Sequence, residues 1–141
     1  MEAKPKPDHP LGVPLMDEDH ARLEAMIARG ATAPDHALEE LLQAIVLEMS
    51  EHFEREEKLM RAQAFPGLHC HFAQHKLLLE EARRPGRVEP AGLRRHISEY
   101  VAQMVQSHVL TLDTVTAAFL KGEIGPASFD GLRLPIEGAG T

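Results

Sequence analysis

Two pairs of polar residues in this sequence have the spacing of a metal site built on helices. His52 precedes Glu56 by four residues, and His71 precedes His75 by the same interval. Residues four apart lie on one face of a helix. Apolar residues surround both pairs at helical spacing, so that face is the one a protein core would bury. Imidazole and carboxylate groups gathered in this way are typical ligands of transition metals.

Two more histidines, His20 and His108, are predicted to share a helix face with apolar residues in other parts of the chain. The apolar residues are Leu23 and Ile27 for His20, and Val101, Val105, Leu112 and Val115 for His108. Asp113 follows His108 by five residues. The candidate metal ligands are therefore His20, His52, Glu56, His71, His75, His108 and Asp113.

A bound metal explains why so many polar groups point toward one core. A buried carboxylate or imidazole without a partner destabilises a fold, and a cation removes that penalty. Five imidazoles and two carboxylates exceed a tetrahedral zinc site but suit two metals bridged by both carboxylates. If the two metals also share one oxygen atom, the metal with three histidines has a complete coordination shell. The other metal, with two histidines, keeps one open coordination position. These ligand types suit iron and also permit manganese, cobalt or zinc.

Four helical stretches separated by Gly- and Pro-rich turns are expected to carry these residues. The apolar periodicity places them near residues 15–30, 32–64, 68–84 and 90–121. Amphipathic helices joined by short turns bury their apolar stripes only against each other. We therefore predict an all-α fold, an up-down-up-down antiparallel four-helix bundle over residues 15–122. Residues 1–14 are predicted to form an extended N-terminal arm and residues 123–141 an extended C-terminal tail.

Composition narrows the possible functions. Aromatic residues make up only 4% of the chain, which favours helices over a sheet. The formal charge of -7 argues against nucleic acid or an anionic membrane as a partner. A single cysteine, Cys70, excludes an intramolecular disulfide and a multi-cysteine metal site. No apolar run suits a signal peptide or a transmembrane helix, so we expect a cytoplasmic protein.

Taken in order, the motifs resemble those of the hemerythrin family. The matching segments are L-G-V-P-L-M-D-E-D-H ending at His20, H-F-E-R-E-E-K-L-M from His52, H-F-A-Q-H from His71 and H-V-L-T-L-D from His108. They span roughly residues 11–121. The resemblance also assigns Asp113, which spacing alone does not mark, because it lies about 140° from His108 on an ideal helix. The sequence departs from the family in having Met104-Val105 where a Trp-Leu or Trp-Phe pair is usual.

The resemblance implies two iron ions joined by an oxo or hydroxo bridge. In that scheme the saturated iron is held by His71, His75 and His108, the iron with the open position by His20 and His52, and both irons by Glu56 and Asp113. Dioxygen would bind reversibly at the open position, so the protein would store, buffer or deliver oxygen and would not be an enzyme. Azide and nitric oxide are other small ligands of such a site. The alternative is an oxygen or redox sensor, or a protein that handles peroxide or nitric oxide, with an unidentified protein partner.

Other residues near these motifs are predicted to have no part in metal binding. The histidines expected to face solvent are His9, His36, His69 and His96. Glu57 is expected on a charged helix face with Glu54 and Lys58. Gly30 is predicted to end the first helix as a C′ residue, and Thr32-Ala-Pro-Asp35 to cap the second.

Overall fold

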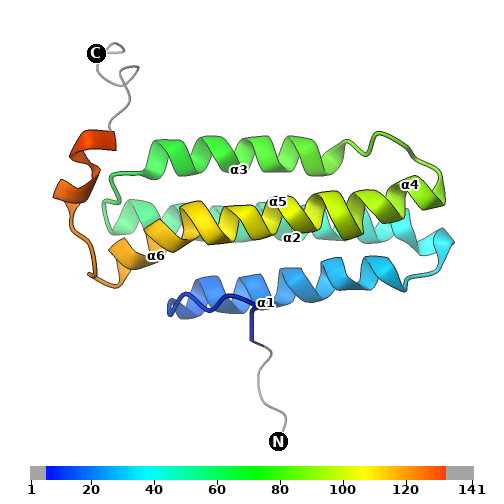
Figure 1. The fold of residues 1–141 in the computed structure, drawn as a ribbon, viewed down its shortest axis with the longest axis horizontal. Coiled ribbons are helices and arrows are strands. Elements are labelled where there is room, and N and C mark those ends of the chain that lie inside the picture. Colours follow the sequence, from blue (N-terminus) through cyan, green and yellow to red (C-terminus); the bar gives the residue numbers. More distant parts are fainter. Residues whose placement is uncertain (1–5, 133–141) are drawn as a thin grey trace, which may run out of the picture.

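The computed structural model describes residues 6–132, which form helices and connecting turns without a strand. The helices form four stretches along the chain, and Figure 1 shows these stretches running alongside one another. The helices are α1 (Pro14–Ala28), α2 (Leu38–Ala62), α3 (Leu68–Arg83), α4 (Pro90–Arg95), α5 (Ala102–His108) and α6 (Thr114–Leu120), the last three forming one stretch. The predicted all-α fold is confirmed. No helix in the described part of the chain is long and apolar enough to span a membrane.

An apolar stripe on each stretch packs into a common core. In α2, Leu38, Ile45 and Met49 are fully buried, and they belong to one cluster with Leu23 of α1 and Ile97 of the fourth stretch. The stripe residues recur every three or four positions, so each helix presents a continuous apolar face to its neighbours. Burial of each large side chain contributes about 1.5–3 kcal/mol, and this packing holds the helices together.

The fourth stretch is interrupted by two π-helical segments, His96–Val101 and Val109–Asp113. A π turn pairs residues five apart instead of four, so it acts as a one-residue insertion in an α-helix. A side chain supports the second segment: Thr114 Oγ1 donates a hydrogen bond of 2.8 Å to the carbonyl oxygen of Val109. The two segments change which residues of this stretch face the core.

The second π segment decides which residues are buried after His108. Regular helical spacing predicts Leu112 and Val115 on the buried face. The structure instead buries Asp113 and Thr116 fully, whereas Val115 is 41% exposed. The prediction for Val115 is wrong because the π turn advances the buried face by one residue. The same turn brings Asp113 onto the face of His108.

Of the two signals predicted between the first two helices, Gly30 lies at the predicted C′ position, directly after the C-cap Arg29, whereas the predicted side-chain cap of the second helix is wrong. Gly30 lies in a 3-10 turn, Arg29–Ala31, and does not have a positive φ. A Cβ atom on Gly30 would lie 2.5 Å from Cγ2 of Ile97, so the glycine permits close packing against the fourth stretch. The second helix begins without a side-chain cap. Asp35 instead accepts a hydrogen bond of 2.7 Å from Arg94 Nη2.

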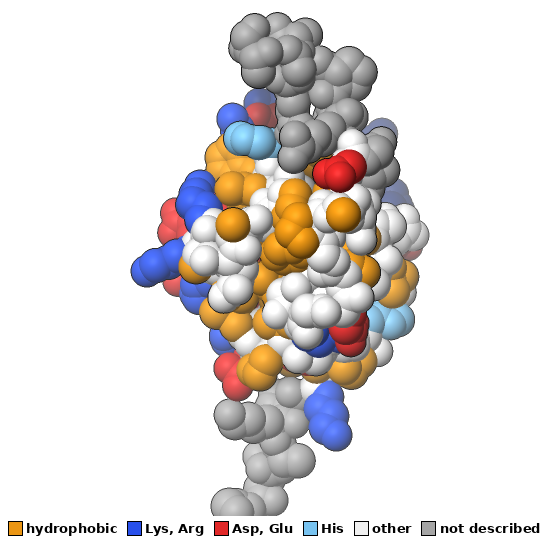
Figure 2. Space-filling view, turned by 90° about the vertical axis from the view of Figure 1, so that its left-hand side faces the viewer, with side chains coloured by type: hydrophobic (Ala, Val, Ile, Leu, Met, Phe, Trp, Pro, Cys, Tyr) orange, Lys and Arg blue, Asp and Glu red, His pale blue; other side chains and the backbone are white. Residues whose placement is uncertain are grey.

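The segment after the fourth stretch packs against the bundle. Pro126–Leu132 forms a 3-10 helix, and the ring centroid of Phe129 lies 5.2 Å from that of Phe65 and 5.9 Å from that of Phe119. Figure 2 views this end of the molecule and shows hydrophobic side chains gathered at its middle. The predicted extended tail is wrong here because the aromatic rings bury apolar surface together. Residues 133–141 of the predicted tail and 1–5 of the predicted arm lie outside the described residues.

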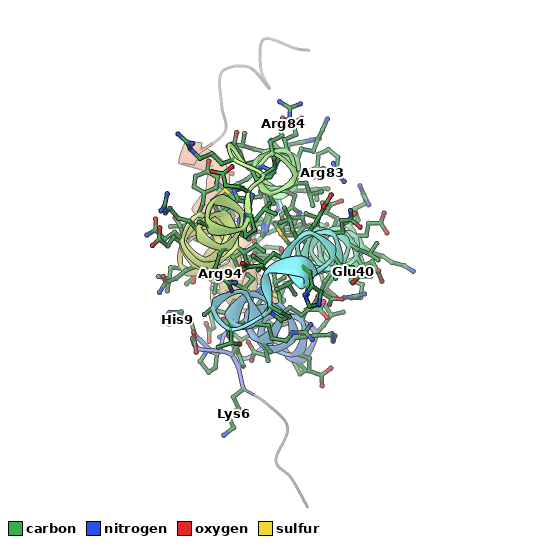
Figure 3. All side chains as sticks on the ribbon, turned by 90° about the vertical axis from the view of Figure 1, so that its right-hand side faces the viewer. Lys6, His9, Glu40, Arg83, Arg84 and Arg94 are labelled. Carbon is green, nitrogen blue, oxygen red and sulfur yellow. The ribbon has the colours of Figure 1, made fainter. Side chains whose placement is uncertain are left out.

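Figure 3 shows the opposite end of the bundle, where Glu40 and Arg83 lie on the outer surface. Arg94 lies near the connection between α1 and α2. Its Nη1 donates a hydrogen bond of 2.9 Å to the carbonyl oxygen of Gly30. The fourth stretch is thereby tied to the turn that follows α1.

Deletion of Leu110, an exposed residue of the second π segment, tests the role of the π turn. Removing one residue restores regular α-helical pairing, and the aspartate then follows His108 by four residues on the same face. We expect this variant to fold and to bind as many metal ions as the native chain, as measured by metal analysis and circular dichroism.

Deletion of the exposed Gln106 in the regular helix α5 is the control. It rotates the two parts of the helix by about 100° relative to each other and should abolish metal binding. If the Leu110 deletion loses metal as completely as the Gln106 deletion, the π turn is not a simple insertion.

Candidate metal centre

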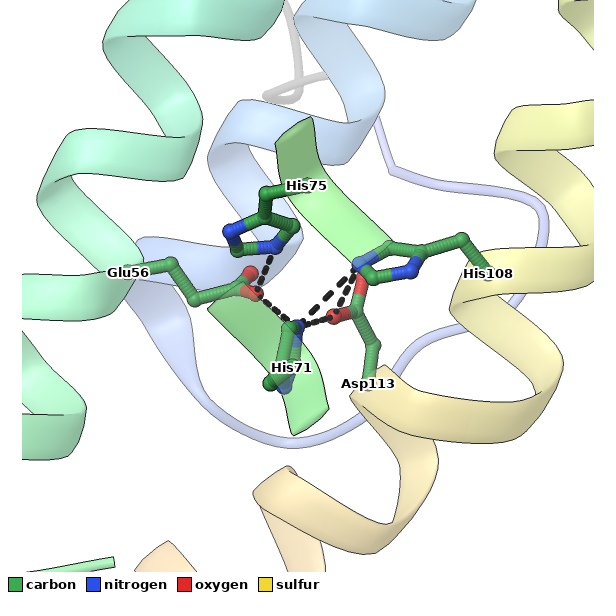
Figure 4. Close-up of side chains that lie close together, drawn as sticks. All are labelled: Glu56, His71, His75, His108 and Asp113. Carbon is green, nitrogen blue, oxygen red and sulfur yellow. Dashed lines mark hydrogen bonds and ion pairs between the residues drawn. The ribbon is translucent and has the colours of Figure 1, made fainter. Parts of the chain in front are cut away.

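The seven candidate ligands meet at one place inside the bundle. They are His20 from α1, His52 and Glu56 from α2, His71 and His75 from α3, His108 from the end of α5 and Asp113 from the following π segment. Each is at most 3% exposed to solvent. Figure 4 shows five of them, with ring nitrogens and carboxylate oxygens pointing toward one another. All four stretches therefore contribute to a single polar cluster.

Glu56 faces histidines on two sides with different oxygen atoms. Its Oε1 lies 2.6 Å from Nε2 of His71 and 3.1 Å from Nε2 of His75. Its Oε2 lies 3.1 Å from Nε2 of His52. One carboxylate therefore links imidazoles that belong to two halves of the cluster.

Asp113 makes the corresponding link from the fourth stretch. Its Oδ1 lies 2.9 Å from Nε2 of His71 and 3.0 Å from Nε2 of His108, and its Oδ2 lies 3.0 Å from Nε2 of His20. Like Glu56, it directs one oxygen to each half. Both carboxylates thus have the arrangement of ligands that bridge two metal ions.

The ligand atoms form two overlapping groups, each compact enough for one metal ion. The first group is Glu56, His71, His75, His108 and Asp113, and the second is His20, His52, Glu56 and Asp113; within each, the atoms lie within 4.8 Å of one another. Metal–ligand bonds of about 2.1 Å place adjacent corners of an octahedron about 3.0 Å apart. The separations of 2.9 and 3.0 Å between Asp113 Oδ1 and its two facing histidines match that spacing.

Several buried atoms in the cluster also lack a hydrogen-bond partner. Within residues 6–132, the unpartnered atoms that face the centre are His20 Nε2, Glu56 Oε2 and both carboxylate oxygens of Asp113. Burying such atoms unpaired costs free energy, and more so when the group is charged. Cations placed among these atoms would satisfy them, so the residues present fit a pair of metal ions.

Hydrogen bonds on the outer side of the rings orient four of the five imidazoles. Each ring turns Nε2 toward the centre, which leaves Nδ1 to bond elsewhere. The Nδ1 partners are Asp19 for His52 at 2.9 Å, Thr116 for His71 at 2.7 Å, Glu57 for His75 at 2.7 Å, and Gln74 for His108. His20 Nδ1 has no hydrogen-bond partner among the described residues.

Two of these partners were not apparent from the sequence. The prediction that Glu57 lies on a charged surface is wrong, because Glu57 is only 8% exposed and accepts its hydrogen bond from His75. Asp19 is buried and also accepts hydrogen bonds from Arg55 Nε at 3.0 Å and Arg22 Nη2 at 2.9 Å. Both carboxylates act across neighbouring helices, so spacing along one helix does not reveal them.

The prediction that His96 faces solvent is also wrong. His96 is buried, and its Nε2 lies 2.8 Å from the carbonyl oxygen of Ala82 in α3. It satisfies a carbonyl near the end of α3 and lies outside both ligand groups. His36 and His69 are exposed, as predicted.

In the protein without bound metal, the carboxylates hold protons on nearby imidazoles. Burial lowers the pKa of His52, but its hydrogen bond to Asp19 and its ion-pair contact with Glu56 outweigh burial and raise the pKa to about 10. Burial likewise lowers the pKa of His71, and its contacts with Asp113 and Glu56 raise it to about 9. The pKa values of the Glu56 and Asp113 carboxyl groups lie below their ordinary values although burial acts in the opposite direction. A metal ion that binds these histidines must therefore displace protons.

Comparisons of the chain with protein-family models, with curated proteins and with solved structures found no match. The function is therefore inferred from the residues and geometry of this centre.

Loading the metal-depleted protein with ferrous iron near pH 7 should release protons. His52 and His71, with pKa values of about 10 and about 9, carry protons at that pH and must lose them to bind metal. We expect about two protons per chain at pH 7, fewer as the pH rises through the two pKa values. A pH indicator under argon measures the release, and a yield that is constant up to pH 10 would contradict the assignment.

The same two protons affect the stability of the metal-depleted protein. Because the folded-state pKa values are raised above 6.5, their contribution is fully present below pH 6.5. It is lost as the pH rises through about 9 and about 10.

Substitution Glu57→Ala should weaken metal binding, because His75 loses the acceptor that orients its ring. Loss of such an outer partner typically lowers metal affinity about 10- to 100-fold. Glu54→Ala removes an exposed carboxylate from the same helix and is the matched control. Competition with a chromogenic chelator measures both affinities. Equal affinities in the two variants would show that Glu57 does not support the site.

Proposed function

We propose that this protein holds two iron ions in the buried cluster and binds dioxygen reversibly there, as hemerythrins do. The proposal includes the up-down-up-down order of the four helical stretches and the resemblance of the four motifs to that family. Storage, buffering or delivery of oxygen would be the physiological use.

One observation carries the proposal most directly. Glu56 and Asp113 each direct one oxygen toward His71 and the other toward the side of His20 and His52. A site for one metal ion does not require carboxylates whose two oxygens point toward different groups of histidines. A bridged pair of metal ions does require them. The count of three imidazoles on one side and two on the other supports a pair in which one ion keeps a position for an added ligand.

The ligand types suit a first-row transition metal, and the resemblance to hemerythrins favours iron over manganese, cobalt or zinc. Imidazoles outnumber carboxylates, and neither group contains a thiolate. A hard alkaline-earth ion would instead prefer a shell of oxygens, and a structural zinc site takes four ligands. When bound, a diferrous pair supplies the electrons that reversible dioxygen binding requires.

Apolar side chains pack against the ligand residues. Met49 and Phe53 are buried on the same helix as His52, and the Phe53 ring stacks on His75 with centroids 3.9 Å apart. Excluding water in this way slows the loss of a weakly held small ligand. It also slows the oxidation of ferrous iron. Two carboxylates and one bridging hydroxide would together offset three of the four positive charges of two divalent ions, which leaves a charge that a protein core can hold.

An anaerobic optical titration tests the proposal. Iron-loaded, reduced protein with two irons per chain should develop charge-transfer absorption when dioxygen is added, and the absorption should disappear under argon. His52→Ala should lose the second iron and the oxygen-dependent bands, because it removes a ligand from the smaller group. His69→Ala changes an exposed histidine and should behave as the native protein.

Three other outcomes would lead to different conclusions. Bands that form once and do not reverse would favour a redox sensor at the same centre. Catalytic consumption of peroxide or nitric oxide would favour an enzyme. Fewer than two bound irons, with no bands, would overturn the proposal.

A further inference from the structure

The fourth helical stretch has no exposed charged side chain over most of its length. Within residues 100–120 the single aspartate, glutamate, lysine or arginine is Asp113, which is buried. Charged residues make up 26% of the whole chain, and α2 has exposed ones such as Glu54 and Lys58. In Figure 1, α5 lies in front of the more distant α2, with α3 next to it. A surface depleted of charge in this way is typical of the core of a protein interface.

Large apolar side chains are exposed on the same part of the surface. Tyr100 is 44% exposed, Leu110 is 49% exposed, and Leu77 of the neighbouring α3 is 53% exposed. Exposed apolar residues that occur singly are common, but these residues lie along one junction of two helices. Tyr100, Gln103, Ser107 and Leu110 follow one another at intervals of three or four, so they form one line along the helix. We call this line, together with Leu77, the neutral face.

The neutral face has a shallow hollow on one side of Ser107 and an apolar protrusion on the other. The hollow lies between α3 and the fourth stretch, and its lining includes Leu77, Gln103 and Met104. Leu110 does not line the hollow, and its half-exposed side chain follows Ser107 by three residues. The hollow and the protrusion are therefore about equally far from Ser107 along the helix.

This arrangement is complementary to a second copy of itself. In two antiparallel copies of the stretch that meet at Ser107, Leu110 of each copy lies opposite Gln103 and Met104 of the other, because three or four residues separate each of them from Ser107. The small side chain of Ser107 lets the two helices approach closely. One surface patch that carries both halves of a contact is what a symmetric dimer requires, since each copy then gives and receives the same contact.

The charge of the chain also favours a second copy as the occupant of this face. Each chain has a formal charge of -7, so two copies repel each other where acidic surfaces meet. The neutral face lets them meet without bringing like charges together. Glu81 lies at the edge of the hollow, where its carboxylate accepts a hydrogen bond of 2.6 Å from the hydroxyl of Tyr100. A basic protein partner would gain more from the acidic surfaces elsewhere on the molecule.

We propose that the neutral face joins two copies of this chain in a symmetric dimer, with Ser107 at the two-fold axis and Leu110 of each copy in the hollow of the other. Residues 100–115 span about 24 Å. Together with α3 they offer roughly 700 Å² per copy, close to the 800 Å² of a standard interface. The dimer covers the outer edge of each metal centre, because Gln74 and His108 also line the hollow. The inference does not depend on which metal the centre holds.

Sedimentation equilibrium of the purified full-length chain tests the proposal. We expect a monomer–dimer equilibrium that shifts toward the dimer as the ionic strength rises, because salt screens the repulsion between two acidic copies. Leu110→Glu should weaken dimerisation by about 100-fold or more, because it places two carboxylates in apolar contacts. Leu47→Glu makes the same change at a residue of α2 that is 60% exposed, and it should leave dimerisation nearly unchanged.

A cysteine at the axis gives a second test that introduces no charge. The exposed Cys70 is first replaced by Cys70→Ser. In that background, Ser107→Cys should form a disulfide between two copies on oxidation with diamide, because a residue at a two-fold axis meets its own counterpart. Gln106→Cys is also exposed on α5 but lies toward α1, and it should cross-link much more slowly. Electrophoresis without reducing agent measures both rates.

Three results would overturn the proposal. The first is a native chain that stays monomeric at millimolar concentration. The second is a Leu110→Glu variant that keeps the native circular dichroism spectrum and dimerises as tightly as the native chain, or dimerisation that only Leu47→Glu abolishes, which would place the interface on α2. The third is equal cross-linking of Ser107→Cys and Gln106→Cys, which would place the axis away from Ser107. None of these results bears on the di-iron proposal, which the optical titration tests separately.

Discussion

The structure of this bundle depends on two buried carboxylates, each of which has only one imidazole partner in the stretch that carries it. Glu56 and Asp113 have no solvent exposure, and each faces imidazoles from other helices. Burying two negative charges side by side is strongly unfavourable unless positive charge lies between them. Protons on His52 and His71 supply it in the metal-free protein, and two metal cations would supply more of it. The position of every helix is therefore linked to the charge balance at the centre.

The outer hydrogen bonds extend this constraint from the cluster to the rest of the molecule. Asp19 holds His52 and is in turn held by Arg22 and Arg55, so an ionic network on the surface of α1 and α2 reaches the centre. Glu57 joins α2 to His75 of α3. Helix packing and the geometry of the cluster are consequently coupled, because a shift of one helix turns an imidazole away from the centre.

The π turn after His108 shows how the fold accommodates this requirement. In a regular helix, apolar residues would be buried after His108 and Asp113 would point away from the face of His108. The cluster would then lack one of its two carboxylates. The extra residue brings the aspartate into line and also places Thr116 where its hydroxyl meets His71 Nδ1 at 2.7 Å. Irregular helical turns are often found at functional sites, and here one irregularity positions both a carboxylate of the cluster and the hydrogen-bond partner of His71.

The sequence by itself determined the all-α class, the approximate helices and six of the seven converging residues, since a regular repeat of three or four positions marks one face of a helix. It did not mark Asp113 by spacing, because the pairing of residues five apart in a π turn is not visible in that repeat. Nor did it show Glu57, Asp19 or His96 as buried, or Phe129 as part of an aromatic cluster. Each of those positions depends on a group contributed by another helix. Only tertiary packing brings such groups together, since the local pattern describes a helix face but not what faces it.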